Sequence, residues 1–261
     1  MIKKCIKPFI PGWLHRKYSH RRVTLHYRKI ARDRAARDSI RSAKEVFSEI
    51  YQNNLWGGKD GEFFSGLGSR FAPAERYVGV VVEFIKRNKI TSVVDLGCGD
   101  FEIGRQIAPA CASYIGVDVV PAVIENNQKK YGNKHIRFEC LDIAEDTLPN
   151  AQLCLIRQVL QHLSNGQISK VLTEARKYQY LIVTEHFPNK ITSINKDKAH
   201  GFGTRVEENS AVFLMEPPFN VADLELLLEI RPVVPNQTGE PEEYPEMGMI
   251  RTYKVTLDRP T

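Results

Sequence analysis

The sequence VVDLGCGDFEIG at residues 93–104 places an apolar segment before three glycines and a helix-forming stretch. Glycines let the backbone approach a ligand closely and adopt positive φ. The N-terminus of a following helix presents free N–H groups and a partial positive charge. The segment therefore predicts a strand, a glycine-rich loop and a helix in a parallel α/β sheet, with a ligand at the carboxyl end of the strand.

The spacing of these glycines argues against a dinucleotide ligand. In the pattern GxGxxG the third glycine comes three residues after the second, whereas Gly104 comes five residues after Gly99. Asp95 stands two residues before Gly97, where its carboxylate would face a pyrophosphate. The loop favours a ligand that carries a positive group and no phosphates, and a nicotinamide-dependent oxidoreductase is the weaker interpretation.

Strand-like segments alternate with helical patterns from residue 90 to residue 185. The predicted strands are 92–96, 114–117, 136–140, 153–156 and 180–184, with helices at 102–108, 123–131 and 168–175. This rhythm indicates βαβ units and a parallel sheet. Upstream, helices are predicted over 21–53 and 72–88. Downstream, a polar insertion at 186–220 precedes a short helix at 221–229 and strands near 231–234 and 250–255.

The composition is that of a soluble globular protein. Hydrophobic residues make up 42% and charged residues 26% of the 261 residues, and no apolar run approaches the ~18–20 residues that cross a bilayer. The N-terminus has too short an apolar core for a secretory signal, so we expect a cytoplasmic location. The five cysteines are widely spaced and form no CxxC pair, which argues against a disulfide framework and a metal site.

The positive charge is concentrated at the N-terminus. Residues 1–45 hold 14 Lys or Arg and 3 Asp or Glu, a net charge of +11, and the remaining residues sum to −5. With Phe9, Ile10, Trp13 and Leu14 among these charges, the segment could contact anionic lipid at the inner membrane face, a phosphorylated glycan or nucleic acid. A solvated basic helix packed on the domain is an equal alternative.

The ordered motifs resemble those of the class I methyltransferases that use S-adenosylmethionine (SAM). DLGCGDFEIG matches the family loop D/E-x-G-x-G-x-x-x-G, with one extra residue before the last glycine, and YIGVDVVP, FECLDI and LCLIRQVLQHL follow at the family's intervals. The resemblance implies a Rossmann-like fold, a mostly parallel seven-stranded sheet with helices on both faces, here with an N-terminal helical extension. It also implies SAM as the cofactor.

The same resemblance assigns cofactor contacts. Asp118 would bind the ribose hydroxyls and Asp142 the adenine amino group. The other residues that it implies around the cofactor in this part of the chain are Asp95, Gly97, Cys98, Gly99, Val119, Ile143 and Gln158. The chain departs from the family at the fourth strand, where many members have an acid and this chain has Arg157 and Gln158. No carboxylate can therefore be assumed at that strand.

A second glycine cluster, LWGGKDGEFFSGLGSR at residues 55–70, precedes the helix that leads into the SAM loop. It matches a WGG…SGxGS segment in a bacterial subgroup of the family, and its aromatic residues distinguish it from a bare linker. We interpret it as a lid over the cofactor, in which residues Ser65, Gly66, Gly68 and Ser69 clamp the methionine end. Arg70 would pair with the methionine carboxylate, and Trp56 would line the pocket. A flexible linker is the alternative.

Candidates for catalysis follow strands four and five. His162, Glu185 and His186 are the predicted acid–base or substrate-orienting residues, because ligands bind at the carboxyl edge of such sheets. Asn195, Asp197 and Arg205 in the insertion, together with His162, are the predicted substrate contacts. The EPPF sequence at 216–219 lies too far along the chain for the DNA amino-methyltransferase motif, and we interpret it as a turn.

These features predict a SAM-dependent O-methyltransferase that acts on a small molecule or a surface-glycan precursor, with no metal and no nucleic-acid partner. A nucleic-acid methyltransferase and a non-catalytic SAM-binding scaffold are the alternatives. Residues 1–71 would form the basic extension and lid, and residues 72–261 the methyltransferase domain. The oligomeric state and the methylated atom stay open.

Overall fold

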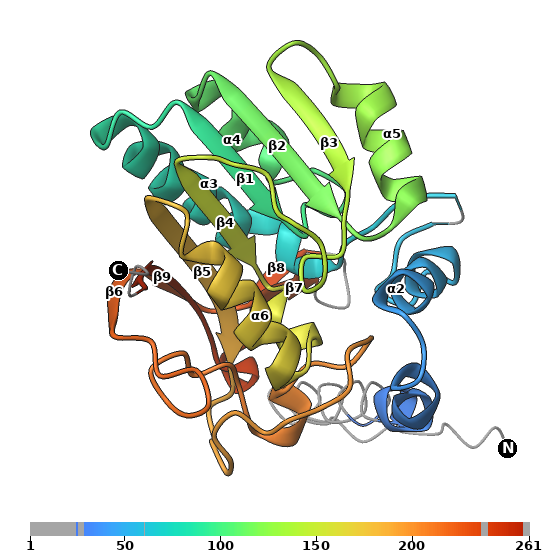
Figure 1. Cartoon of the computed structure of the whole chain (residues 1–261). Coiled ribbons are helices and arrows are strands. Elements are labelled where there is room, and N and C mark those ends of the chain that lie inside the picture. Colours follow the sequence, from blue (N-terminus) through green and yellow to red (C-terminus); the bar gives the residue numbers. More distant parts are fainter. Residues whose placement is uncertain (1–24, 26–28, 60, 236–239, 258–261) are drawn as a thin grey trace, which may run out of the picture.

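A computed structural model describes residues 25, 29–59, 61–235 and 240–257 (Figure 1). Its centre is a seven-stranded sheet in the order β3-β2-β1-β4-β5-β9-β6. The strands are β1 (Ser92–Leu96), β2 (Ser113–Asp118), β3 (Ile136–Cys140), β4 (Leu153–Arg157), β5 (Tyr180–Phe187), β6 (Asp223–Ile230) and β9 (Met249–Thr256). Strands β1 to β5 pair in parallel, whereas β9 is antiparallel to both β5 and β6. The predicted Rossmann-like, mostly parallel fold is confirmed.

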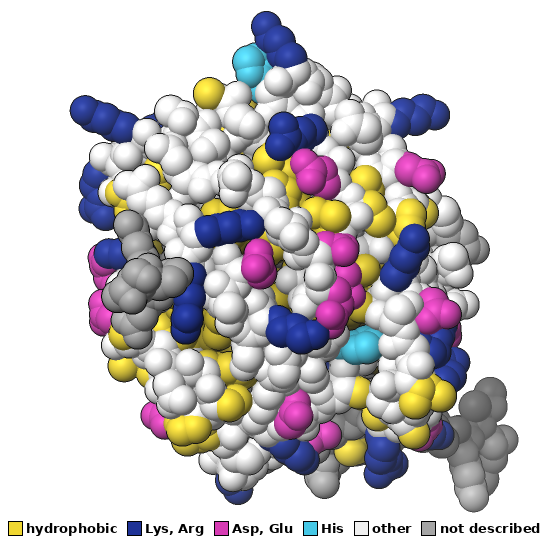
Figure 2. All heavy atoms as spheres, in the orientation of Figure 1, with side chains coloured by type: hydrophobic (Ala, Val, Ile, Leu, Met, Phe, Trp, Pro, Cys, Tyr) yellow, Lys and Arg dark blue, Asp and Glu magenta, His cyan; other side chains and the backbone are white. Residues whose placement is uncertain are grey.

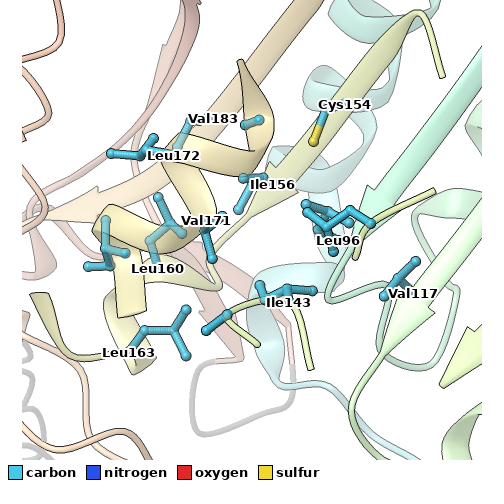
Figure 3. Close-up of a cluster of buried hydrophobic side chains, with 14 of the residues drawn as sticks. Leu96, Val117, Ile143, Cys154, Ile156, Leu160, Leu163, Val171, Leu172 and Val183 are labelled. Carbon is cyan, nitrogen blue, oxygen red and sulfur yellow. The ribbon is translucent and has the colours of Figure 1, made fainter. Parts of the chain in front are cut away.

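Helices cover both faces of this sheet. They are α2 (Ala43–Gln52), α3 (Phe71–Arg87), α4 (Gly104–Ile107), α5 (Pro121–Tyr131) and α6 (Asn165–Ala175). Alternate residues of each strand enter two separate cores, as the two-residue period of a strand requires. Cys154 and Ile156 of β4 pack with α2 and α6, as Figure 3 shows for the α6 side, whereas Leu153 and Leu155 pack with α3.

One structural prediction at the C-terminal side is wrong. Residues 221–229 were expected to form a helix, but 223–230 form strand β6, which pairs with β9 at the edge of the sheet. Leu and Glu favour helices locally, and the pairing with β9 overrides that preference. The strand predicted near 231–234 is present as β7 (Val233–Pro235), which pairs with β8 (Pro241–Glu243) in a separate two-stranded sheet.

The long N-terminal helix predicted over 21–53 is interrupted. Residues 29–38 are helical, a turn follows, and α2 starts afresh after Ser42. The Ser42 side chain accepts a hydrogen bond from the N–H of Glu45, and the Glu45 side chain accepts from the N–H of Ser42, which is a capping box. The basic and apolar residues of 1–20 lie outside the described residues. No described helix is long and apolar enough to cross a membrane.

Candidate functional site

The carboxyl ends of four strands meet at one cavity of about 150 Å³. The order of strands in the sheet sets the order of polar groups along it: Asp142 beyond β3, Asp118 at the end of β2, the Gly97–Gly99 loop after β1, and Arg157 at the end of β4. The predicted cofactor residues that line the cavity are Trp56, Ser65, Ser69, Asp95, Gly97, Cys98, Gly99, Asp118, Val119, Asp142, Ile143 and Gln158. The sheet topology thus brings together residues that are far apart in the chain.

Asp118 holds the glycine loop in place while it faces the cavity. Its carboxylate accepts hydrogen bonds from the N–H groups of Gly99, at 3.1 Å, and Val120, at 3.0 Å. Each carboxylate oxygen has two acceptor positions, so these bonds leave room for hydroxyl donors. Burial raises the pKa of Asp118 to about 6, despite its backbone hydrogen bonds. The arrangement suits a ligand with neighbouring hydroxyl groups.

The glycine loop is shaped by its neighbours. Gly97 has φ +79°, and a Cβ there would lie 2.4 Å from the Val159 side chain, so this position requires glycine. Asp95 is buried below the loop and accepts a hydrogen bond from the hydroxyl of Tyr114 at 2.9 Å. Burial raises the pKa of Asp95 to about 6. Asp142 is half-buried, and its side chain also accepts from the N–H of Ala144.

The first glycine cluster packs directly on the second. The N–H of Ser65 donates to the Asp100 carboxylate at 3.1 Å, and the N–H of Asp100 donates to the Ser65 hydroxyl at 2.7 Å. The hydroxyl of Tyr51 in α2 also contacts Ser65 Oγ at 2.8 Å. A Cβ at Gly99 would lie 2.3 Å from Ser65 Oγ, so the two loops touch where glycine leaves room. Residues 63–70, the segment hereafter called the lid, therefore cover the glycine loop.

Arg70, Gly66 and Gly68 belong to the lid but do not line the cavity. Arg70 was expected to pair with a carboxylate of the cofactor. Its guanidinium instead forms an ion pair with Asp100 at 2.8 Å and lies over the Phe64 ring. The Gly68 carbonyl instead accepts a hydrogen bond from Arg157. Arg70 thus fastens the lid to the glycine loop.

Arg157 is a cavity residue to which the sequence analysis gave no role. Its guanidinium lies 5.0 Å from the centre of the Tyr77 ring and donates to the Gly68 carbonyl and to Gln158 Oε1. Burial lowers its pKa. Tyr51, Tyr77 and Asp100 also line the cavity without having been predicted. The two tyrosines stand at apolar positions of helices, where the sequence pattern cannot separate a pocket wall from the core.

His162 lies on the cavity wall in the short turn Leu160–His162, against the rings of Trp56 and Phe47. Its Nδ1 lies 3.1 Å from the carbonyl oxygen of Gly201. A carbonyl only accepts, so Nδ1 carries the proton. Burial lowers the pKa of His162 to about 3, so the ring is neutral at neutral pH. A ring that is so hard to protonate is better suited to orienting an acceptor than to taking its proton.

The structure does not bring Glu185 or His186 to the cavity. The buried Glu185 carboxylate accepts from the N–H groups of Leu160, at 2.9 Å, and Gln161, at 3.2 Å, and thereby fixes the turn that carries His162. Burial raises its pKa to about 8. His186 points to the opposite face of β5, where its Nε2 contacts the carbonyl of Met247, and burial lowers its pKa to about 4.

The three predicted substrate contacts in the insertion also lie away from this cavity. Asn195 is buried and bonds both the N–H and the carbonyl of Phe213. Asp197 accepts from the N–H of Asn165 at the start of α6. Arg205 donates to the Leu160 carbonyl and to the Asn165 side chain. Asp197 and Arg205 thus fasten the insertion to α6 and to the His162 turn, and Asn195 holds the insertion together internally. The EPPF segment forms the turn that its prolines predict.

Comparisons with known proteins are consistent with this geometry. Residues 93–178 match the family described as methyltransferase domain. The fold is similar to that of human N-acetylserotonin methyltransferase in complex with SAM, with 15% identity over 83% of this chain and 60% of that chain, and a TM-score of 0.49. N-methyltransferase NodS from Bradyrhizobium japonicum WM9, in complex with S-adenosylhomocysteine (SAH), has 14% identity over 79% of this chain and 98% of that chain, with a TM-score of 0.49.

A third structure, solved in work on the conversion of a disulfide bond into a thioacetal group during echinomycin biosynthesis, has 12% identity. It covers 81% of this chain and 92% of that chain, with a TM-score of 0.50. A search of curated proteins gives no match. This third similarity shows a shared fold alone, and the acceptors of the three proteins do not transfer to this chain.

Proposed function

We propose that the chain is a class I SAM-dependent methyltransferase, as the match of residues 93–178 to a methyltransferase domain indicates, and that its acceptor is a hydroxyl of a small polar molecule, such as a sugar or a surface-glycan precursor. The observation that carries the proposal is the cavity under the lid. It holds a carboxylate at β2, an acid beyond β3 and a guanidinium at β4, with the turn of His162 beside them.

The cavity residues fit the parts of SAM. Asp118 has free acceptor positions for two ribose hydroxyls, and Asp142 can accept from an adenine amino group. Ile143, Val119 and Leu141 line the same end and offer apolar contact to a purine ring. When bound, SAM supplies an electrophilic methyl group on a positively charged sulfur. The chain's own task is to align the acceptor with that group and to exclude water.

The wall around His162 supports a small acceptor with a ring. Trp56 and Phe47 stand beside His162, with ring centroids 5.4 and 6.4 Å from the imidazole. Aromatic faces pack against the apolar face of a sugar ring, while the neutral imidazole can form a hydrogen bond with one of its hydroxyls. His162 would then position the hydroxyl oxygen, and its proton would leave to solvent as the methyl group is transferred.

The face of the molecule drawn in Figure 2 offers little support for a nucleic-acid acceptor. Figure 2 shows acidic and basic side chains intermixed over the face that it presents, without a continuous basic stripe. The basic N-terminal segment lies outside the described residues, and its contact with an anionic membrane stays a proposal. We also propose that residues 1–71 act as extension and lid to a methyltransferase domain formed by 72–261.

The proposed function is tested in two steps. Calorimetry with SAH and with NADH comes first, and we expect binding of SAH alone. A mass-spectrometric screen of cell-envelope sugar extracts then searches for products that gain one methyl group in the presence of SAM. Methylation of nucleic acid but not of any sugar would overturn the acceptor class. SAH binding with no turnover on any extract would favour a SAM-binding scaffold.

A further inference from the structure

Arg157 is a cation without a direct ion pair. Within the described part of the chain, no Asp or Glu oxygen lies within 4.0 Å of its guanidinium, and the carboxylates of Asp95 and Glu185 act on it only from farther away. Its hydrogen bonds go to neutral oxygens, the Gly68 carbonyl and Gln158 Oε1, and its Nε is buried without a partner. A half-buried guanidinium that forms no direct ion pair is costly for a fold. The group lies on the wall of the cofactor cavity, so an anionic ligand group could supply the missing partner.

The order of the strands in the sheet indicates which part of the ligand would lie beside Arg157. The cavity runs across β3, β2, β1 and β4, and neighbouring strands are about 4.8 Å apart, so the span is about 14 Å. Asp142 and Asp118 occupy the β3 and β2 end, which suits adenine and ribose. An elongated SAM molecule would then extend its amino-acid end past the glycine loop towards β4. The anion at that end of SAM is the methionine carboxylate.

The other arginine near this end is already paired. Arg70 forms its ion pair with Asp100 at 2.8 Å and does not line the cavity. Arg157, in contrast, is held over the Tyr77 ring, and its hydrogen bond to Gly68 joins it to the lid. An anion bound at Arg157 would therefore contact a residue that is also hydrogen-bonded to the closed lid.

We propose that Arg157, at the end of β4, binds the methionine carboxylate of SAM and links the presence of that carboxylate to the closed lid. This inference rests on the proposed function insofar as it requires SAM in the cavity. It gives a role to the position where the chain departs from its relatives, since a cation stands there in place of an acid.

The test compares SAM with decarboxylated SAM, which keeps the adenosine, the sulfonium and the amine. The wild-type protein is expected to bind SAM about ten- to a hundredfold more tightly than decarboxylated SAM, as for a lost charge-assisted hydrogen bond. In Arg157→Gln this ratio is expected to fall towards one, because only SAM loses a partner. Arg157→Lys keeps the charge without the planar fork and should retain an intermediate ratio.

Arg70→Gln is the matched control, because it loosens the lid without touching the proposed carboxylate site. It is expected to weaken both ligands alike and to leave their ratio unchanged. Equal weakening of both ligands by Arg157→Gln would overturn the proposal and leave Arg157 as a support of the lid. Unchanged affinity of Arg157→Gln for both ligands would also overturn it and would direct Arg157 to an acceptor. If the wild-type protein bound neither ligand, the proposed function itself would fail. If Arg157→Gln did not fold, the Arg157→Lys ratio would decide.

Discussion

At the scale of single residues, the cavity is defined by a few buried acids whose charge depends on what they face. Asp118 and Asp95 both lie below the glycine loop, and burial raises the pKa of each to about 6. In the proposed site the free acceptor positions of Asp118 would face the ribose. Its ionisation would then become part of cofactor binding.

Replacing Asp118 by Ala is expected to weaken SAM binding by about 2–3 kcal/mol, because hydroxyl donors lose a charged acceptor. In the wild-type protein, SAM affinity should also fall as the pH drops below about 6, since the protonated carboxyl must lose its proton to accept both hydroxyls. Calorimetry between pH 5 and pH 8 measures both effects. Glu145→Gln, at an exposed residue paired with Lys170, serves as the control. Unaltered affinity in Asp118→Ala would remove the ribose assignment.

His162 makes a second prediction, on stability. Its folded pKa of about 3 lies below the unfolded value of 6.5, so between these values only the unfolded chain binds the proton. The contribution of His162 to stability is therefore complete above pH 6.5 and is lost as the pH falls, by at most about 1.4 kcal/mol per pH unit. The stability difference between wild type and His162→Phe should grow from pH 4 to pH 6.5 in urea unfolding. Parallel curves would show that the ring is not buried in its neutral form.

At the scale of elements, the lid is held to the glycine loop by a small polar network centred on Asp100. This carboxylate receives the N–H of Ser65 and the guanidinium of Arg70, so one residue fixes both ends of the lid. The contact is local and partly buried, with 8% of the Asp100 side chain exposed. A polar network of this kind can control the rate at which a ligand is released.

Arg70→Gln and Asp100→Asn are each expected to speed SAH release about 5- to 30-fold, equivalent to about 1–2 kcal/mol. The double variant should release SAH little faster than either single variant, because both changes remove the same ion pair. Stopped-flow displacement measures these rates. Rates that multiply in the double variant would show that the two side chains act separately.

Helix α3, which leads from the lid into β1, contains an exposed glycine. An added Cβ at Gly79 meets nothing within 4 Å, and its φ lies outside the left-handed region. Gly79→Ala is therefore expected to raise the free energy of unfolding by about 0.5–1 kcal/mol, with SAM affinity unchanged. Gly104→Ala, whose Cβ would lie 2.3 Å from the Phe101 ring, is expected to destabilise the protein. Thermal unfolding measures the melting temperature of both variants, and equal shifts of this temperature in Gly79→Ala and Gly104→Ala would contradict this explanation.

At the scale of the whole molecule, charge divides the chain into two regions. The first 45 residues carry a net +11 and the rest a net −5. Membrane association, if it occurs, is thus expected to depend on the N-terminal segment and to weaken with salt.

Deletion of residues 1–20 is expected to reduce sedimentation with phosphatidylserine-containing vesicles, while SAH affinity measured in solution stays the same. Neutral phosphatidylcholine vesicles are the control for apolar binding. Equal sedimentation of the full and the shortened chain would leave the basic segment without a membrane role.

The sequence by itself determined the strand–helix rhythm, the glycine loop after β1 and the acids at the ends of β2 and β3. These follow from local patterns, such as apolar periods of two residues and glycines where the backbone must turn. The sequence also contains the signal for the break before α2, because Ser42 and Glu45 form the capping box at which this helix begins.

Only the tertiary structure decided which polar residues face the cavity. Glu185, Asn195 and Arg205 have the composition of site residues, yet their hydrogen bonds go to backbone groups that the fold buries around them. The sequence alone does not distinguish the roles of Arg70 and Arg157. In the fold Arg70 pairs with Asp100, whereas Arg157 forms no ion pair within the described part of the chain. Strand β6 forms because it pairs with β9 at the edge of the sheet, although leucine and glutamate locally favour a helix.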